Sequence, residues 1–195
     1  MRNIAAVILA AGGSSRFGEP KQLLSFRGET LVRRAVRAAT EALCDPVIVV
    51  VGQTSDAIRD ELCATPAIVV ENAQWQLGLG TSIRSGLRGC AESTEAVVLL
   101  ACDQPLVDAT IVAGLIAARE KTGKPIIASS YADTLGIPAL FDRSCFDDLL
   151  ALPDKAGAKV LIAARPNDIA SIGFEDGAID IDTPADFQRL IAEFE

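Results

Sequence analysis

The chain has 195 residues, half of them apolar, with 18 basic and 26 acidic side chains, a formal net charge of −8 and no histidine. A chain of this length is expected to fold as one globular domain with a sizeable buried core. The acidic balance argues against a nucleic-acid-wrapping protein, because such proteins need a positive field to displace phosphate counterions. The missing histidine excludes Ser-His-Asp catalysis, Cys-His catalysis and every histidine metal site.

The cysteines and the N-terminal residues indicate the cellular compartment in which the protein is expected. Five cysteines are widely spaced without a C-x-x-C pair, so neither a disulfide framework nor a zinc ribbon is expected. The apolar N-terminal run is short and leads into a glycine-rich turn, unlike a signal peptide. No stretch approaches the roughly 20 apolar residues that a membrane span needs. We therefore expect a soluble, cytoplasmic protein with neither a membrane nor a nucleic-acid partner.

Short apolar runs alternate with amphipathic stretches along most of the chain. The runs are continuously apolar instead of alternating with polar residues, which is typical of a parallel sheet covered by helices on both faces. Strands are expected at 4–9, 47–51, 67–70, 96–101 and 125–129, and helices at 31–43, 55–62, 81–89 and 108–121.

After Ser129 the alternation is less regular, but it continues without an internal repeat or a linker. The last helix has a clear start, because Thr183 can cap it, Pro184 fits its first turn and Asp186 can complete a capping box. The pattern predicts a single α/β domain over residues 1–195. The remaining strands are expected at 136–141, 169–172 and 178–181, and the remaining helices at 143–152 and 156–164.

The block LAAGGSSRFGEPKQLL, residues 9–24, lies where the first expected strand ends. Open α/β sheets bind ligands at this edge. Gly12 and Gly13 allow backbone N–H groups to turn toward an anion, and Arg16 and Lys21 add two positive charges. The combination suits a polyphosphate, although it is neither a Walker loop nor a GxGxxG loop. A glycine-rich loop with solvated charges is the alternative.

Asp103 comes directly after the most hydrophobic expected strand, so its carboxylate is expected at the same edge of the sheet as the glycine loop. Mg²⁺ binds through one or two carboxylates together with phosphate oxygens, so a carboxylate beside a triphosphate suits it. Asp180 and Asp182 are the candidate second carboxylates. A turn or capping role is the alternative for each, and crowding of the three predicts that Asp103→Asn slightly stabilises the protein without ligand.

A second block of small residues opens the helix expected at 81–89. A helix start offers unpaired N–H donors, and glycines there allow a flat ring to approach closely. Trp75, just before this helix, either stacks on a ligand or packs within the fold. The block contains Asn72, Gly78, Gly80, Thr81 and Ser82.

Five blocks in this order resemble the motifs of the MobA-like nucleotidyltransferases, and within that group the molybdenum cofactor cytidylyltransferases. The first block resembles the signature LAAGxSxRFGxPKxLL, and residues 72–87 resemble NxxWxxGxxxSxxxGL. ACDQPLV at 101–107 resembles the DxP metal loop, GIPALFDRS at 136–144 the GxPxLF segment, and DIDTPADF at 180–187 the C-terminal DxDTPxD. The resemblance covers nearly the whole chain. It implies a three-layer α/β/α, Rossmann-like fold with a mostly parallel sheet, of the nucleotide-diphospho-sugar transferase type.

The resemblance also implies a Mg²⁺-dependent enzyme that moves CMP from CTP to molybdopterin, or its molybdenum form, and releases pyrophosphate. It implies catalytic roles for Arg16, Lys21 and Asp103, a metal held by Asp103, Asp180 and Asp182, and docking to a molybdenum hydroxylase or its chaperone. The nucleotide-binding residues that it implies are Leu9, Ala10, Ala11, Gly12, Gly13, Ser14, Arg16, Lys21, Asn72, Gly78, Gly80, Thr81, Ser82 and Asp103.

Two departures from the family pattern fall on the acceptor side. The chain reads LPDKAGAKVL at 152–161, with Lys159 in place of an arginine, and Ile137 where many relatives have histidine. The same fold with GTP, as in molybdopterin guanylyltransferases, or with a sugar or polyol phosphate acceptor therefore stays open. LAAG in place of the LAGG of guanylyltransferases favours CTP. A dinucleotide oxidoreductase, for which GxGxxG is missing, and a non-catalytic cofactor chaperone are the remaining alternatives.

Overall fold

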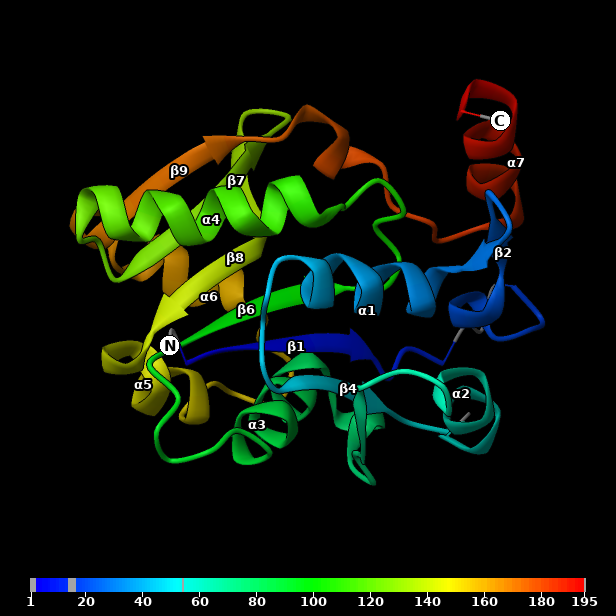
Figure 1. Cartoon of the computed structure of the whole chain (residues 1–195), viewed down its shortest axis with the longest axis horizontal. Coiled ribbons are helices and arrows are strands. Elements are labelled where there is room, and N and C mark those ends of the chain that lie inside the picture. Colours follow the sequence, from blue (N-terminus) through cyan, green and yellow to red (C-terminus); the bar gives the residue numbers. More distant parts are fainter. Residues whose placement is uncertain (1–2, 14–16, 54, 195) are drawn as a thin grey trace.

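The computed structural model describes residues 3–13, 17–53 and 55–194, and these residues build one seven-stranded sheet. The strands are Ile4–Ala10 (β1), Val47–Val51 (β4), Ile68–Glu71 (β5), Ala96–Ala101 (β6), Ile126–Tyr131 (β7), Thr134–Asp142 (β8) and Ile169–Gly173 (β9). Their order is β5-β4-β1-β6-β8-β7-β9 (Figure 1). Only β8 runs antiparallel to its neighbours, β6 and β7. The mostly parallel sheet is thus confirmed.

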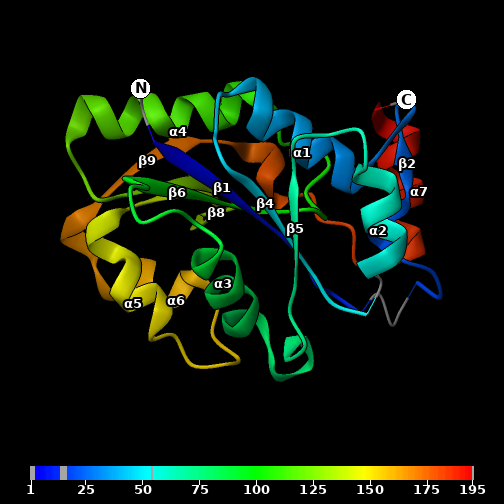
Figure 2. The ribbon, with the colours of Figure 1, turned by 60° about the horizontal axis from the view of Figure 1, so that its bottom comes forward.

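Helices cover both faces of the sheet, which gives the three layers that Figure 2 shows. One face packs against Leu31–Glu41 (α1), Ser55–Leu62 (α2) and Ala109–Thr122 (α4), and the other against Leu79–Arg88 (α3), Phe146–Leu150 (α5) and Ala158–Ala164 (α6). Successive strand residues face opposite layers. In β1, Ala6 and Ile8 join one hydrophobic cluster, whereas Ala5 and Val7 join the other. The strands are therefore buried on both faces, as their continuous apolar runs predict.

The last helix, Pro184–Phe194 (α7), packs beside a small hairpin of Ser25–Phe26 (β2) and Glu29–Thr30 (β3) (Figure 1). The two share a third hydrophobic cluster of Phe26, Leu31, Ile181 and Leu190. The predicted capping box of α7 is confirmed. Asp186 N donates to Thr183 Oγ1 at 3.3 Å, and Thr183 N donates to Asp186 Oδ2 at 2.7 Å.

Two expected elements are wrong. Residues 178–181 are not a strand, because a 3₁₀ turn ends at Ala178 and the chain then crosses to the end of β6, where Ile181 N donates to Asp103 O at 2.9 Å. Residues 143–152 form a 3₁₀ turn followed by the short α5, not one helix. The helix expected at 31–43 ends at Glu41, because Leu43 takes a left-handed conformation with φ of 63°.

Candidate active site

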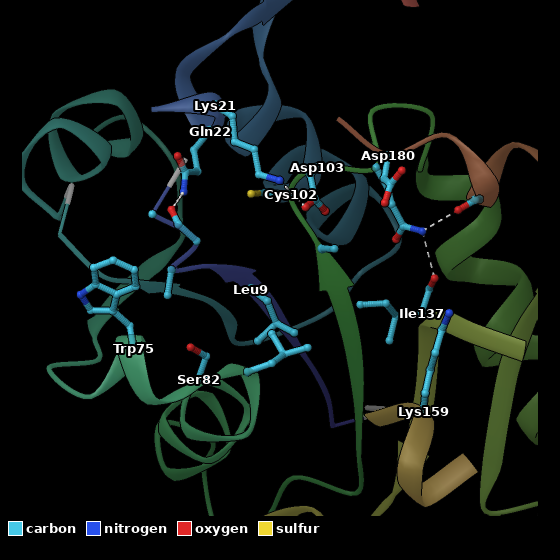
Figure 3. Close-up of a pocket in the computed structure, with 18 of the residues that line it drawn as sticks. Leu9, Lys21, Gln22, Trp75, Ser82, Cys102, Asp103, Ile137, Lys159 and Asp180 are labelled. Atoms are coloured by element: carbon cyan, nitrogen blue, oxygen red, sulfur yellow. Dashed lines mark hydrogen bonds and ion pairs between the residues drawn. The ribbon is translucent and has the colours of Figure 1, made fainter. Parts of the chain in front are cut away.

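A cavity of about 540 Å³ opens at the ends of β1 and β6, the edge at which parallel sheets bind ligands. The glycine loop after β1, the start of α3, the turn after β6 and the segment before α7 surround it (Figure 3). Of the predicted residues, the cavity is lined by Leu9, Ala11, Gly12, Gly13, Lys21, Gly78, Ser82, Asp103 and Asp180. Ser14 and Arg16 lie outside the described residues.

Lys21 joins three segments that are far apart in the sequence. Its Nζ donates to Asp103 Oδ2 at 2.8 Å, to Asp182 Oδ1 at 3.1 Å and to Ile181 O at 2.9 Å. Its side chain is only 11% exposed. Burial lowers the pKa of Lys21, but the charge of Asp103 and the hydrogen bonds to Asp103 and Asp182 outweigh burial, so the pKa is raised. The ammonium group is therefore charged at neutral pH.

Two of the three predicted metal carboxylates, Asp103 and Asp182, contact this ammonium group, and Asp180 lies close enough for its pKa to respond to the charge of Lys21. Burial raises the pKa of Asp180, and the charges of Asp182 and Asp103 raise it further. The described part of the chain contains no group of three acidic, cysteine or histidine side chains arranged to hold a metal by themselves. Carboxylate oxygens are nevertheless the donors that Mg²⁺ prefers, and Mg²⁺ usually completes its shell with phosphate oxygens and water. The donor set fits a hard divalent cation that arrives with a phosphate ligand.

Gln22 fixes the glycine loop from inside the protein. It is fully buried, and its Nε2 donates to Ala10 O and Gly12 O, both at 2.8 Å. These bonds tie the loop to the turn that carries Lys21. Gln22 stands beside Lys21 in the first motif, but no pattern in the sequence marks it as a residue of the site. Ala10 does not line the cavity. Its carbonyl group instead accepts the hydrogen bond from Gln22.

Asn72 and Thr81 lie behind the cavity wall. Asn72 Nδ2 donates to Thr81 Oγ1 at 2.8 Å and to Ser82 Oγ at 3.1 Å, and its Oδ1 accepts from Gln74 N at 3.0 Å. Both residues are buried, and only Ser82 of this group lines the cavity. The arrangement assigns Asn72 and Thr81 to holding the turn before α3 in place.

Gly78 and Gly80 lie so close to the backbone of the loop after α5 that neither position has room for a side chain. A Cβ at Gly80 would collide with Pro153 O, and one at Gly78 would lie 2.7 Å from Lys155 Cα, in a backbone that already has φ of 134°. Gly80 N donates to Asp154 O at 2.8 Å. The loop after α5 fills the space on the Cβ side of Gly80, and Gly80 does not line the cavity, so the approach of a flat ring there stays a prediction.

The opposite wall of the cavity contains Ile137 and Lys159, which depart from the family pattern, together with Gln104 and Tyr131. Gln104 Nε2 donates to Ile137 O at 3.1 Å and to Gly177 O at 2.9 Å. Tyr131 Oη donates to Ile137 O at 2.9 Å, and Lys159 Nζ lies 5.9 Å from the centre of the Tyr131 ring. Within the described residues no carboxylate pairs with Lys159. This wall therefore presents a positive charge that no acidic group of the site neutralises.

A buried lysine held by carboxylates thus lies in the cavity at the open edge of this sheet. Residues 6–169 match the MobA-like NTP transferase domain. The chain belongs to this family and is a nucleotidyltransferase of the MobA-like type.

Relatives match over nearly the full length of the chain. It is 28% identical to nicotine blue oxidoreductase of Paenarthrobacter nicotinovorans, over 96% of each chain. The structure of Rv0371c from Mycobacterium tuberculosis H37Rv has 28% identity and a TM-score of 0.86, over 98% of this chain and 99% of that one. A second structure of Rv0371c is a complex with manganese, with 29% identity and a TM-score of 0.79 over the same shares. An Rv0371c homolog from Mycobacterium sp. strain JC1 has 33% identity and a TM-score of 0.82, over 98% and 97%.

No helix in the described ranges is long and apolar enough to cross a membrane.

Proposed function

We propose that this protein transfers a cytidylyl group from CTP to a phosphorylated acceptor, molybdopterin or its molybdenum form, and releases pyrophosphate. The observation that carries the proposal is the Lys21–Asp103 ion pair beside the LAAG loop, at the mouth of one cavity. The loop supplies small residues beside which a triphosphate can lie, and the pair supplies the charges that a triphosphate and its cation require.

The charged residues act by stabilising negative charge. An oxygen of the acceptor phosphate attacks the α-phosphorus of CTP, and the bond to the leaving pyrophosphate breaks. Because a phosphate monoester is already ionised near neutral pH, the reaction needs no general base from the protein. Lys21, with Arg16 as a second cation, neutralises charge on the phosphates and on the leaving group, and positioning supplies much of the remaining rate enhancement.

Asp103, together with Asp182 or Asp180, would hold Mg²⁺. The ion would neutralise charge on the triphosphate and the leaving pyrophosphate. Hard oxygen donors in this cluster support a divalent cation, and so does the manganese complex of Rv0371c.

Lys159 supports an anionic acceptor. Its ammonium group lies on the wall opposite the glycine loop, against Tyr131. No carboxylate among the described residues forms an ion pair with it. On this proposal a phosphate or another acidic group of the acceptor binds there. Delivery of the product to a molybdenum hydroxylase or its chaperone, in the cytoplasm, belongs to the same proposal.

Nucleotide titration by calorimetry, with and without Mg²⁺, tests the proposal. We expect CTP to bind only with Mg²⁺ and more tightly than GTP, because the loop reads LAAG. Equal or tighter binding of GTP contradicts the choice of CTP but leaves the nucleotidyltransferase reaction in place.

An oxidoreductase is the second candidate, favoured by the full-length similarity to nicotine blue oxidoreductase. Titration with NADH and NADPH separates the two functions. Binding of a reduced nicotinamide dinucleotide with no binding of any NTP and Mg²⁺ would favour the oxidoreductase, whereas the reverse supports nucleotidyl transfer.

A further inference from the structure

The indole ring of Trp75 lies against the glycine loop, on the side of the cavity away from Ile137 and Lys159 (Figure 3). A Cβ added at Gly13 would lie 2.8 Å from Trp75 Cη2 and Cζ3. A Cβ added at Gly52, just after β4, would lie 2.8 Å from Trp75 Cγ. Carbon atoms do not approach so closely without displacement. The ring therefore fills the space that side chains at both positions would need, and it joins the ends of β1 and β4.

The turn that carries Trp75 is itself held in place. Asn72 N donates to Val51 O at 2.8 Å, and Trp75 N donates to Asn72 O at 3.2 Å. The buried side chain of Asn72 connects the same turn to the start of α3. The backbone of the turn that carries Trp75 is thus held by hydrogen bonds that do not involve the glycine loop.

Gly12 and Gly13 differ in what they face. A Cβ added at Gly12 would meet nothing within 4 Å, whereas one at Gly13 would meet the indole ring. Neither residue has a backbone φ in the positive range, so the difference lies in their surroundings. Gly12 faces open space, whereas the missing side chain at Gly13 allows its backbone to lie close to the indole ring of Trp75.

We propose that Trp75 is a positioning residue that holds the backbone at Gly13 in place, and thereby the part of the nucleotide-phosphate site that Gly12 and Gly13 form. The inference rests on the proposed binding of a nucleoside triphosphate at this loop. Trp75 acts through Gly13, so its loss weakens phosphate binding whatever base the nucleotide carries. Stacking of Trp75 on the base is the competing role, and it predicts weaker binding of the nucleotide only.

Calorimetry with two Mg²⁺-bound probes, CTP and inorganic triphosphate, separates the two roles. We expect Trp75→Ala to weaken both probes by a similar factor, roughly tenfold, and Trp75→Phe to restore most of the affinity because a ring still supports Gly13. Weaker binding of CTP with unchanged binding of inorganic triphosphate overturns the proposal in favour of stacking.

A double-mutant cycle tests the contact with Gly13 itself. Gly13→Ala weakens both probes in the wild-type background, because its methyl group displaces either the loop or the ring. In the Trp75→Ala background the same change has a much smaller effect, because the obstructing ring is gone. Gly12→Ala is the matched control, and its effect is expected to be the same in both backgrounds. An equal effect of Gly13→Ala in the two backgrounds contradicts the role of Trp75.

Fluorescence reports on the contact without any ligand, because Trp75 is the only tryptophan in the chain. Gly13→Ala shifts its emission, and Gly12→Ala leaves the emission unchanged. The binding measurements distinguish failure of the proposed function from failure of the positioning role. A wild-type protein that binds neither probe contradicts the proposed function, whereas normal binding by Trp75→Ala contradicts only the positioning role.

Discussion

Lys21 Nζ lies 2.8 Å from Asp103 Oδ2, and this ion pair connects residues that are 82 positions apart in the chain. The same nitrogen holds Asp182 and the carbonyl group of Ile181. Lys21 therefore brings together the turn that carries it, the turn after β6 with Asp103 and the segment before α7 with Asp182. The ion pair also gives Asp103 a structural role beside its proposed contact with a cation.

Asp103→Asn tests both roles. We expect it to abolish binding of Mg²⁺–CTP and to lower the free energy of unfolding by about 1–3 kcal/mol, because the buried ammonium group of Lys21 loses a charged partner. This sign is opposite to the one that crowding among the carboxylates alone predicts. Denaturant unfolding measures the change. Asp182→Asn is the control, and its 51% exposed side chain predicts a smaller loss; equal stability of Asp103→Asn and wild type contradicts the structural role.

Gln22→Leu is expected to separate the glycine loop from the turn that carries Lys21. The substitution removes the amide that binds Ala10 O and Gly12 O, so one or both carbonyl groups lose their buried partner. We expect a loss of about 1–3 kcal/mol in the free energy of unfolding, together with weaker binding of Mg²⁺–CTP. Thermal unfolding and calorimetry measure the two effects. An unchanged affinity for CTP would show that the loop keeps its shape without Gln22.

Lys159→Gln is expected to raise KM for the acceptor while the affinity for Mg²⁺–CTP stays the same, because Lys159 lies on the opposite wall from the glycine loop. Lys159→Arg keeps the positive charge and is expected to restore most of the loss. Steady-state kinetics with varied acceptor measure the effect. Weaker CTP binding in Lys159→Gln would instead assign the lysine to the nucleotide.

Asp142 gives the fold a pH dependence that is independent of the site. Burial raises its pKa, but the hydrogen bonds from Arg119, at 2.9 Å from Nε, and from Ser144 N outweigh burial, so the pKa is lowered. A lowered pKa stabilises the folded state above the usual carboxyl pKa of about 4, and this contribution disappears as the pH falls through the lowered value.

We therefore expect Asp142→Asn to cost about 1–2 kcal/mol of unfolding free energy at neutral pH, because Arg119 on α4 loses its partner on β8. The difference from wild type is expected to vanish in acid. Chemical unfolding from pH 7 down to pH 2 measures both curves. A difference that is constant over this range contradicts the ion pair as its cause.

Much of the fold can be predicted from local patterns. The continuous apolar runs predict a sheet covered on both faces, and Thr183 with Asp186 predicts the start of α7. The common sheet edge of Lys21 and Asp103 follows because each comes after a strand of that sheet.

The remaining features depend on contacts between distant segments. The reversed strand β8, the filling of the space at Gly80 by the loop after α5, and the indole ring on Gly13 leave no periodic signal in the sequence. The same holds for Gln22, because nothing in its neighbours shows that its amide binds the loop before it. Long-range packing decides these features.

Transfer of label from CTP is the most direct test of the central proposal. CTP labelled at the α-phosphate is incubated with Mg²⁺, molybdopterin and the protein, and the label in the acceptor is measured together with pyrophosphate. Nucleotidyl transfer predicts one labelled acceptor for each pyrophosphate released, and a decrease on the order of 10²-fold in Lys21→Ala. Label that stays in CTP, or wild-type transfer by Lys21→Ala, would contradict it.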